Sequence, residues 1–312
     1  MFYNTSVRGA TRRKPRYLRI AVAFKAGVPI GRGGEGIGSS VGAAAMGCGI
    51  KHKGEPDMID EIRIERDGAV AELVLDRPRK LNAITPAMAA EIERLARDLD
   101  RDDGVRAVLL RGAGDKAFCA GSDLNALAAY PTAWKFRNRI EYATAIRNMR
   151  KPVVAALHGW VLGGGAEMAL SADIRIMATS ARLGFPEVAR GWVGGGGASQ
   201  MLPRLIGYGQ AMKLLLSGEP IGAAEALRLG IVEEVVEDGG EVARARALCR
   251  LFAGYSPVAV EAVKSAVRAS MNTTLPAGIA YENEMNVLCF SAGDHMEGIN
   301  AFREKREATF ER

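Results

Sequence analysis

Two glutamates and a run of glycines are the residues of this chain whose types and spacing could do chemistry. The run Leu162-Gly163-Gly164-Gly165-Ala166-Glu167 is followed, twenty residues after its glutamate, by Phe185-Pro186-Glu187. Glycines set against the first turn of a helix offer backbone N–H groups to an oxygen anion. A second carboxylate on a nearby turn would complete an acid/base pair.

A third segment, Ala117-Phe118-Cys119-Ala120-Gly121-Ser122-Asp123-Leu124, lies upstream of the glycines. We expect a strand end and a turn that lead into a helix with Asp123 in its first turn, where a carboxylate suits the positive end of the dipole. The Ser122 N–H would then face outward and pair with the Gly164 N–H. Two such donors from separate segments can stabilise an enolate oxygen. Taken alone, the glycines could instead serve only close packing of strand against helix.

In this order the motifs resemble those of the crotonase superfamily, and with both acids present the chain is most similar to the enoyl-CoA hydratases. The resemblance covers residues 58–312. It implies that the amides of Ser122 and Gly164 form an oxyanion hole, and that Glu167 and Glu187 hold one water between them. Serine stands at 122 where alanine or glycine is common, but only its amide is used. The alternative for either glutamate is a helix-dipole or salt-bridge residue.

The resemblance also implies a coenzyme A site. The segment 77–83 resembles the loop that embraces the CoA adenine and phosphates, with Arg79 and Lys80 as phosphate partners. Segment 301–306 resembles the stretch whose aromatic and lysine touch the nucleotide of a neighbouring subunit, although it could equally be a solvated helix face. The residues expected to bind substrate or CoA are Arg79, Lys80, Leu81, Ala83, Ala120, Ser122, Asp123, Leu124, Gly163, Gly164, Pro186, Phe302 and Lys305.

After the second glutamate the sequence departs from the family pattern. Gly194 stands where proline is usual, and Ala198-Ser199 replaces Gly-Thr. Trp160 and Trp192 could shape an acyl pocket, and the alternative is that both are buried core aromatics.

The elements that must position these residues are predicted from local patterns. Residues 62–65 and 70–75 flank Asp67-Gly68 and predict a hairpin. Thr85-Pro86 predicts a helix start, followed by an apolar stripe. Further strands are expected at 106–111, 152–157 and 172–177, with helical or glycine-rich segments between them, which indicates βαβ units and a largely parallel sheet. From Gly207 onward the chain is expected to be nearly all helical, in the segments 209–216, 223–229, 241–252, 256–269, 275–290 and 294–306.

For the fold class, the resemblance implies an α/β protein, a crotonase-like spiral of ββα units with a helical C-terminal trimerisation region. Two such trimers usually form a hexamer. We expect three parts: residues 1–57 as a disordered basic and glycine-rich extension, 58–252 as the spiral core, and 253–312 as the helical C-terminal region.

Charge is concentrated at the N-terminus. The whole chain carries +6, but residues 1–57 hold ten Lys/Arg and three acids, which leaves 32 basic and 33 acidic side chains in the rest. The extension resembles a transit peptide in being arginine-rich and acid-poor, and a cloning remnant or an over-extended translation start remain open. A non-catalytic or RNA-binding protein that uses this arm is an alternative that the near-neutral body argues against.

Several site classes find no support in the sequence. The four cysteines and three histidines are too dispersed for a metal cluster, and no apolar stretch reaches the ~18 to 20 residues needed to cross a bilayer. We therefore expect a cytoplasmic protein, or a mitochondrial matrix protein if residues 1–57 are a transit peptide, with no membrane or nucleic-acid partner.

The resemblance implies an enoyl-CoA hydratase of fatty-acid or related acyl-CoA degradation. It needs no metal or redox cofactor, because coenzyme A is part of the substrate. The alternatives are other reactions of the superfamily, enoyl-CoA isomerisation or acyl-CoA hydrolysis, since a fold does not fix the chemistry.

Overall fold

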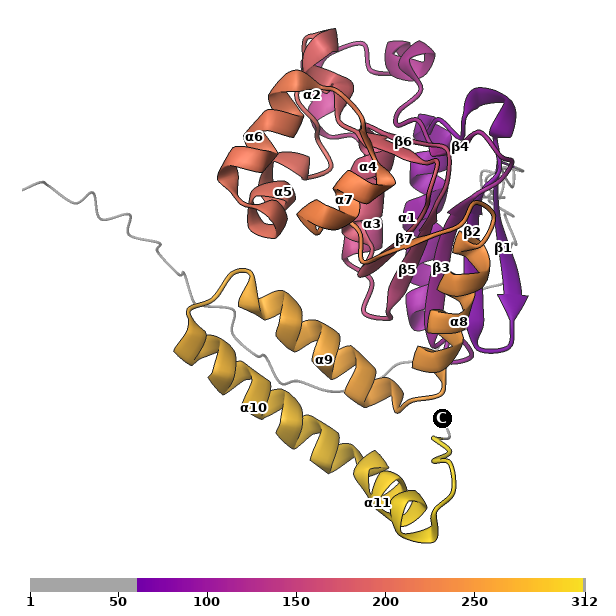
Figure 1. Ribbon diagram of the computed structural model, residues 1–312, viewed down its shortest axis with the longest axis vertical. Helices are drawn as coiled ribbons and strands as arrows, with labels where there is room; N and C mark the ends of the chain where they lie inside the picture. The colour runs from indigo at the N-terminus through magenta and orange to yellow at the C-terminus, as the bar shows by residue number, and fades with distance from the viewer. Residues whose placement is uncertain (1–60, 311–312) are drawn as a thin grey trace, which may run out of the picture. The chain divides into compact units, whose positions relative to one another are not determined.

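The structure is a computed structural model that describes residues 61–310 (Figure 1). The expected disorder of residues 1–57 lies outside the described residues. Two sheets are present. The larger has the order β1-β2-β3-β5-β7-β10 and the smaller the order β4-β6-β8-β9. The strands are β1 (Ile62–Asp67), β2 (Val70–Leu75), β3 (Ala107–Gly112), β4 (Ala117–Cys119), β5 (Val153–Leu157), β6 (Trp160–Leu162), β7 (Ile174–Ala178), β8 (Arg182–Gly184), β9 (Ile221–Gly222) and β10 (Glu234–Val236).

Helices connect and cover these strands. The α-helices of the described part are α1 (Pro86–Arg101), α2 (Ala133–Arg137), α3 (Tyr142–Arg147), α4 (Gly164–Ser171), α5 (Ala198–Ile206), α6 (Tyr208–Ser217), α7 (Ala223–Leu229), α8 (Glu241–Ala253), α9 (Pro257–Ser270), α10 (Leu275–Ala292) and α11 (Asp294–Glu304). Three 3₁₀ helices, η1 (Pro78–Lys80), η2 (Leu124–Ala129) and η3 (Pro186–Arg190), follow strand ends.

The large sheet confirms the predicted hairpin and the parallel strands. β1 and β2 pair antiparallel around the turn at Asp67 and Val70, and each later neighbour pair is parallel. Both faces are covered, because in β3 Val108 and Leu110 join the core cluster that contains α1, whereas Leu109 joins the cluster under α8. Burial on both faces explains the continuous apolar runs of these strands.

The predicted helix after Thr85-Pro86 is confirmed. It begins at Pro86, and the Met88 N–H donates to the Thr85 hydroxyl (3.1 Å), which is the expected N-cap. Its buried face includes Met88, Ile92 and Leu99.

The small sheet carries the site, and of its strands only the end of β4 was expected from the sequence. β4, β6 and β8 are three residues long and pair in parallel with one another. Strands this short show no apolar alternation that a sequence could reveal. The carboxyl ends of parallel strands meet at one edge of a sheet. As a result, the three motifs that follow β4, β6 and β8 are brought together.

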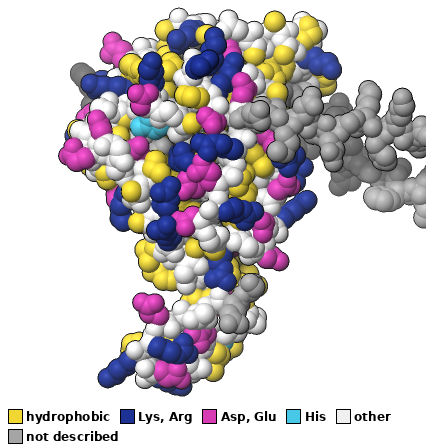
Figure 2. All heavy atoms as spheres, turned by 90° about the vertical axis from the view of Figure 1, so that its right-hand side faces the viewer, with side chains coloured by type: hydrophobic (Ala, Val, Ile, Leu, Met, Phe, Trp, Pro, Cys, Tyr) yellow, Lys and Arg dark blue, Asp and Glu magenta, His cyan; other side chains and the backbone are white. Residues whose placement is uncertain are grey.

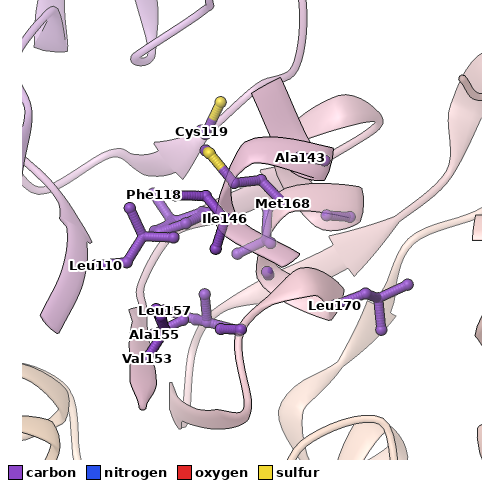
Figure 3. Packing of buried hydrophobic residues seen from close by; sticks show 14 of the residues in the cluster. Leu110, Phe118, Cys119, Ala143, Ile146, Val153, Ala155, Leu157, Met168 and Leu170 are labelled. Carbon is purple, nitrogen blue, oxygen red and sulfur yellow. The ribbon is translucent and has the colours of Figure 1, made fainter. Parts of the chain in front are cut away.

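The core beneath this edge joins the small sheet to α4. In Figure 3, Met168 of α4 lies close to Ile146 of α3 and to Phe118 and Cys119 of β4. All four side chains are fully buried. The packing fixes the start of α4 against the end of β4.

The C-terminal region is helical as expected, and in Figure 1 α9, α10 and α11 lie below the sheets. Lys264 Nζ on α9 donates to the Lys151 carbonyl (2.5 Å), which ties this helix to the segment before β5. The expectation that the chain after Gly207 is nearly all helical is confirmed, and the exceptions are the short strands β9 and β10, which complete the sheet edges. The division at residue 252 stays a prediction.

Candidate active site

The segments that carry the two expected amide donors, Ser122 and Gly164, meet where β4 and β6 end. Ser122 pairs with Ile84, but the two hydrogen bonds of this bridge are donated by the Ile84 amide to Gly121 (2.8 Å) and by the Asp123 amide to Ile84 (2.8 Å). The Ser122 N–H takes no part in that bridge. Gly164 is the first residue of α4, so its N–H is among those without an intrahelical acceptor.

The two segments lie in close contact. Gly121 has a φ of +93°, and a Cβ placed there would lie 3.1 Å from the Gly164 nitrogen. The amide of Gly164 is therefore adjacent to the residue that precedes Ser122. The two residues of the expected donor pair, distant in the sequence, thus lie on neighbouring segments, which is a precondition of an oxyanion hole.

Glu187 lies beside the glycine run. Gly163 has a φ of +55°, and a Cβ there would lie 3.1 Å from Glu187 Oε1. Glu187 is in the first turn of η3, directly after β8, and is half-buried. Burial raises the pKa of its carboxyl, and the charge of Glu167 raises it further.

The side chain of Glu167 is hydrogen-bonded by the glycine-rich loop of residues 194–198. Glu167 as a residue is 3% exposed, and its carboxylate accepts hydrogen bonds from the amides of Gly196 to Oε2 (2.8 Å) and Ala198 to Oε1 (3.0 Å). A Cβ at Gly194 would lie 2.5 Å from Glu167 Oε1. Burial raises the pKa of Glu167, and the amide hydrogen bonds oppose that rise.

The loop that departs from the family pattern thus has a defined role here. Glycine at 194 leaves room for the carboxylate, and the amides at 196 and 198 orient it. Sequence reasoning noted the departure but missed these amide donors. The number of glycines between residues 194 and 197 was the available signal, since close approach of backbone to a ligand or side chain favours glycine.

Chemically, the site combines two amide donors with two carboxyl groups whose pKa values are both raised. A raised pKa makes a carboxyl group better suited to exchange protons with a substrate than an ordinary glutamate. The two donors would stabilise negative charge that develops on a carbonyl oxygen between the strand ends.

The prediction for Asp123 is wrong in detail. Asp123 is the N-cap of η2, where its carboxylate accepts from the Asn125 amide (2.9 Å), and it does not lie inside a helical turn. Arg77 Nη1 donates to Asp123 Oδ2 (2.8 Å), and this hydrogen bond lowers the pKa of the carboxyl. A carboxylate engaged in this way orders the loop after Ser122.

The basic segment lies next to this loop. The Ala120 amide donates to the Leu81 carbonyl (2.9 Å), and Arg77 Nη1 donates to the Ala83 carbonyl (3.0 Å). Arg79 and Lys80 are exposed at the end of η1. The predicted residues of segments 77–83 and 120–124 therefore share one edge of the protein.

Other predicted residues do not join this group in the same chain. Phe302 is 85% exposed on α11 and Lys305 is the C-cap of that helix. In Figure 1, α11 lies at the bottom of the view, well below α4. Pro186 is the first residue of η3 and does lie beside Glu187.

The two tryptophans are not core residues. Trp160 is 42% and Trp192 41% exposed, so the alternative of buried core aromatics is wrong. Trp192 stacks on Phe136 with ring centroids 5.9 Å apart, and Tyr130 meets Phe136 edge-on at 5.7 Å. These rings form an aromatic group on the segment between η2 and α3 and on the loop after η3.

The surface of the body carries charges of both signs. On the face in Figure 2, basic and acidic side chains are interspersed rather than gathered in one basic patch. A face of this kind is poorly suited to a nucleic-acid backbone. Within residues 61–310, every helix is too short or too polar to span a membrane.

Known proteins resemble this chain over most of its length. Residues 65–312 match the family model described as Enoyl-CoA hydratase/isomerase. The chain is 36% identical to a short-chain-enoyl-CoA hydratase of Clostridium acetobutylicum over 252 residues, covering 80% of this chain and 97% of that protein. It is 34% identical to a crotonyl-CoA hydratase of Syntrophomonas wolfei over 255 residues, covering 80% and 98%. The crystal structure of an enoyl-CoA hydratase from Bacillus anthracis superposes with a TM-score of 0.75 at 33% identity and covers 80% of this chain and 98% of that one.

Proposed function

The chain belongs to the enoyl-CoA hydratase/isomerase family, and on that premise we propose that it adds water across the 2,3 double bond of an enoyl-CoA thioester. One observation carries the choice of hydration within the family. Glu187 lies against Gly163, the N-cap residue of α4 that precedes Gly164. Glu167 lies in the first turn of α4. A second carboxyl group at this place gives the site both an acid and a base.

In the proposed reaction, the thioester oxygen accepts hydrogen bonds from the amides of Ser122 and Gly164. Glu167 takes a proton from a water molecule, the water oxygen bonds to C3, and the electrons of the double bond move to the thioester oxygen as an enolate. Glu187 then gives a proton to C2, and the product is the 3-hydroxyacyl-CoA. The roles follow from the two amide donors on Glu167, which favour its charged form.

Coenzyme A is proposed to bind along the edge formed by segments 77–83 and 120–124. Main-chain groups of Leu81, Ala83 and Ala120 lie there, with Arg79 and Lys80 exposed for phosphate contacts. Since coenzyme A belongs to the substrate, no further cofactor is proposed.

We propose that the protein assembles as a trimer or a hexamer through its C-terminal helices. These helices expose large apolar side chains in this chain, which include Val263, Val267, Leu275, Ile279, Val287, Phe290 and Phe302. Several exposed large apolar side chains on neighbouring helices are typical of subunit contacts. Phe302 and Lys305 would then reach the nucleotide of a neighbouring subunit. The proposed compartment is the cytoplasm, or the mitochondrial matrix if residues 1–57 act as a transit peptide.

Crotonyl-CoA tests the reaction. A hydratase removes the ultraviolet absorbance of the enoyl thioester and forms 3-hydroxybutyryl-CoA. Release of free coenzyme A would instead support the hydrolase alternative, and conversion of a 3-enoyl-CoA to its 2-enoyl isomer without hydration would support the isomerase. Salt-sensitive RNA retention that is lost on removal of residues 1–57, without turnover of any thioester, would support the binding alternative.

Glu167→Gln and Glu187→Gln should each abolish most of this turnover. Glu237→Gln is the matched control, because Glu237 is exposed at the end of β10, away from the site motifs. Full activity in either site variant would overturn the acid/base assignment.

A further inference from the structure

Tyr142 lies where the two proposed oxyanion donors meet. It is the first residue of α3 and 5% exposed, and its hydroxyl oxygen is 3.1 Å from Ser122 Oγ. A Cβ placed at Gly164 would overlap the same hydroxyl oxygen. One phenol oxygen thus contacts both segments that supply the amides.

The direction of the hydrogen bond follows from burial. Ser122 Oγ is the hydrogen-bond partner that the described structure provides for the Tyr142 hydroxyl. A buried hydroxyl rarely leaves its proton unpaired, and a phenol is a better donor than an alcohol. Burial also raises the pKa of Tyr142 well above its usual value, so the phenol stays protonated at neutral pH. Tyr142 therefore donates and Ser122 accepts.

Ser122 is an exposed residue on the turn between β4 and η2. The bridge to Ile84 holds its neighbours Gly121 and Asp123 but not the Ser122 N–H, so the hydrogen bond to Tyr142 is a direct restraint on Ser122 itself. Donors in an oxyanion hole act only when they stand about 2.7 to 3.1 Å from the developing charge. Alanine or glycine at 122 would offer the phenol no acceptor.

We propose that Tyr142 is a positioning residue of the oxyanion hole, which fixes the spacing of the Ser122 and Gly164 amides through its hydrogen bond to Ser122 Oγ and its contact with the Gly164 backbone. The inference rests on the proposed function and deepens it. Tyr142 acts through the two amides, and Ser122 contributes its side chain as well as its N–H.

The test is a double-mutant cycle with Tyr142→Phe, Ser122→Ala and the combination. We expect each single variant to lower kcat for crotonyl-CoA about tenfold with little change in KM, because the donors are misplaced mainly for the enolate-like transition state. The double variant should be no slower than either single variant, since both remove the same hydrogen bond. Ser122→Thr keeps the acceptor and should retain most of the activity.

Two controls separate positioning from general stability. Tyr208→Phe removes an exposed hydroxyl and should change nothing. Binding of acetoacetyl-CoA, whose enolate form absorbs in the near ultraviolet, should weaken in Tyr142→Phe and show a smaller enolate band. This readout needs no turnover and does not respond to a loss of folding stability alone. If Tyr142→Phe fails to fold, Ser122→Ala and Ser122→Thr still carry the test.

Unchanged kcat in Tyr142→Phe and Ser122→Ala would overturn the inference, as would losses that multiply in the double variant. The failure of the proposed function would look different. In that case the parent protein would not hydrate crotonyl-CoA, or Glu167→Gln and Glu187→Gln would remain active.

Discussion

The two glutamates should differ in what they contribute to folding, although we propose that both take part in turnover. Glu167 Oε1 and Oε2 each accept a main-chain N–H, from Ala198 and Gly196. In Glu167→Gln the amide nitrogen must face one of these donors. One charge-assisted hydrogen bond is lost, and a buried N–H is left without an acceptor.

The magnitude can be worked from these contacts. Loss of a hydrogen bond to a charged group destabilises a protein by about 1.5 to 3 kcal/mol. The neutral side chain also avoids the desolvation that raises the pKa of Glu167, which offsets part of that loss. The net change should be about 1 to 2 kcal/mol, or a Tm lower by roughly 2 to 8 °C for a chain of this size. Glu187, half-buried in η3 and free of the Gly196 and Ala198 amides, should lose much less stability on substitution.

Activity should fall by about 10² to 10⁴-fold in both variants, because each loses a proton-transfer group. The assay is thermal unfolding at matched protein concentration, combined with crotonyl-CoA hydration, for Glu167→Gln, Glu187→Gln and the control Glu237→Gln. If Glu167→Gln melts at the temperature of the parent while Glu187→Gln melts lower, the loop contacts do not hold the first glutamate as described.

Three further results are expected. Gly163→Ala forces a side chain into a left-handed backbone conformation against Glu187 Oε1, so it should lower the free energy of unfolding by about 1 to 3 kcal/mol and also lower kcat. The control Gly209→Ala places its methyl group in open space and should change neither quantity. Equal unfolding midpoints of the two variants in denaturant would contradict this expectation. The pKa values of Glu167 and Glu187 are raised above the usual 4.5. As the pH is lowered, the carboxylate that acts as base should therefore become protonated at a higher pH than an exposed glutamate would, and kcat/KM should fall there. An acid limb of kcat/KM at or below pH 4.5 would be inconsistent with the site. Phe302→Ala should raise KM for CoA thioesters about 3- to 10-fold with an unchanged kcat if Phe302 contacts the nucleotide of a neighbour; an unchanged KM would remove that contact.

Local patterns were enough for much of the scaffold. The β1–β2 hairpin follows from the turn at Asp67-Gly68, and α1 begins where Thr85-Pro86 predicts it. These elements depend on residues a few positions apart, so their signals are contained in the sequence. Asp123 marks the limit of this reasoning, because a helix start and an N-cap on a 3₁₀ turn share the same local residues.

The types of the proposed catalytic groups were likewise indicated by the sequence, through the glycine run before Glu167 and the motif around Glu187. The hydrogen bonds that position these groups were decided only by the fold. Gly196 lies 29 and Ala198 31 positions from Glu167, and Tyr142 lies 20 positions from Ser122. Hydrogen bonds over such separations form only when the three-residue strands β4, β6 and β8 pair side by side, and that pairing depends on the packed core beneath them rather than on any periodicity in the strands themselves.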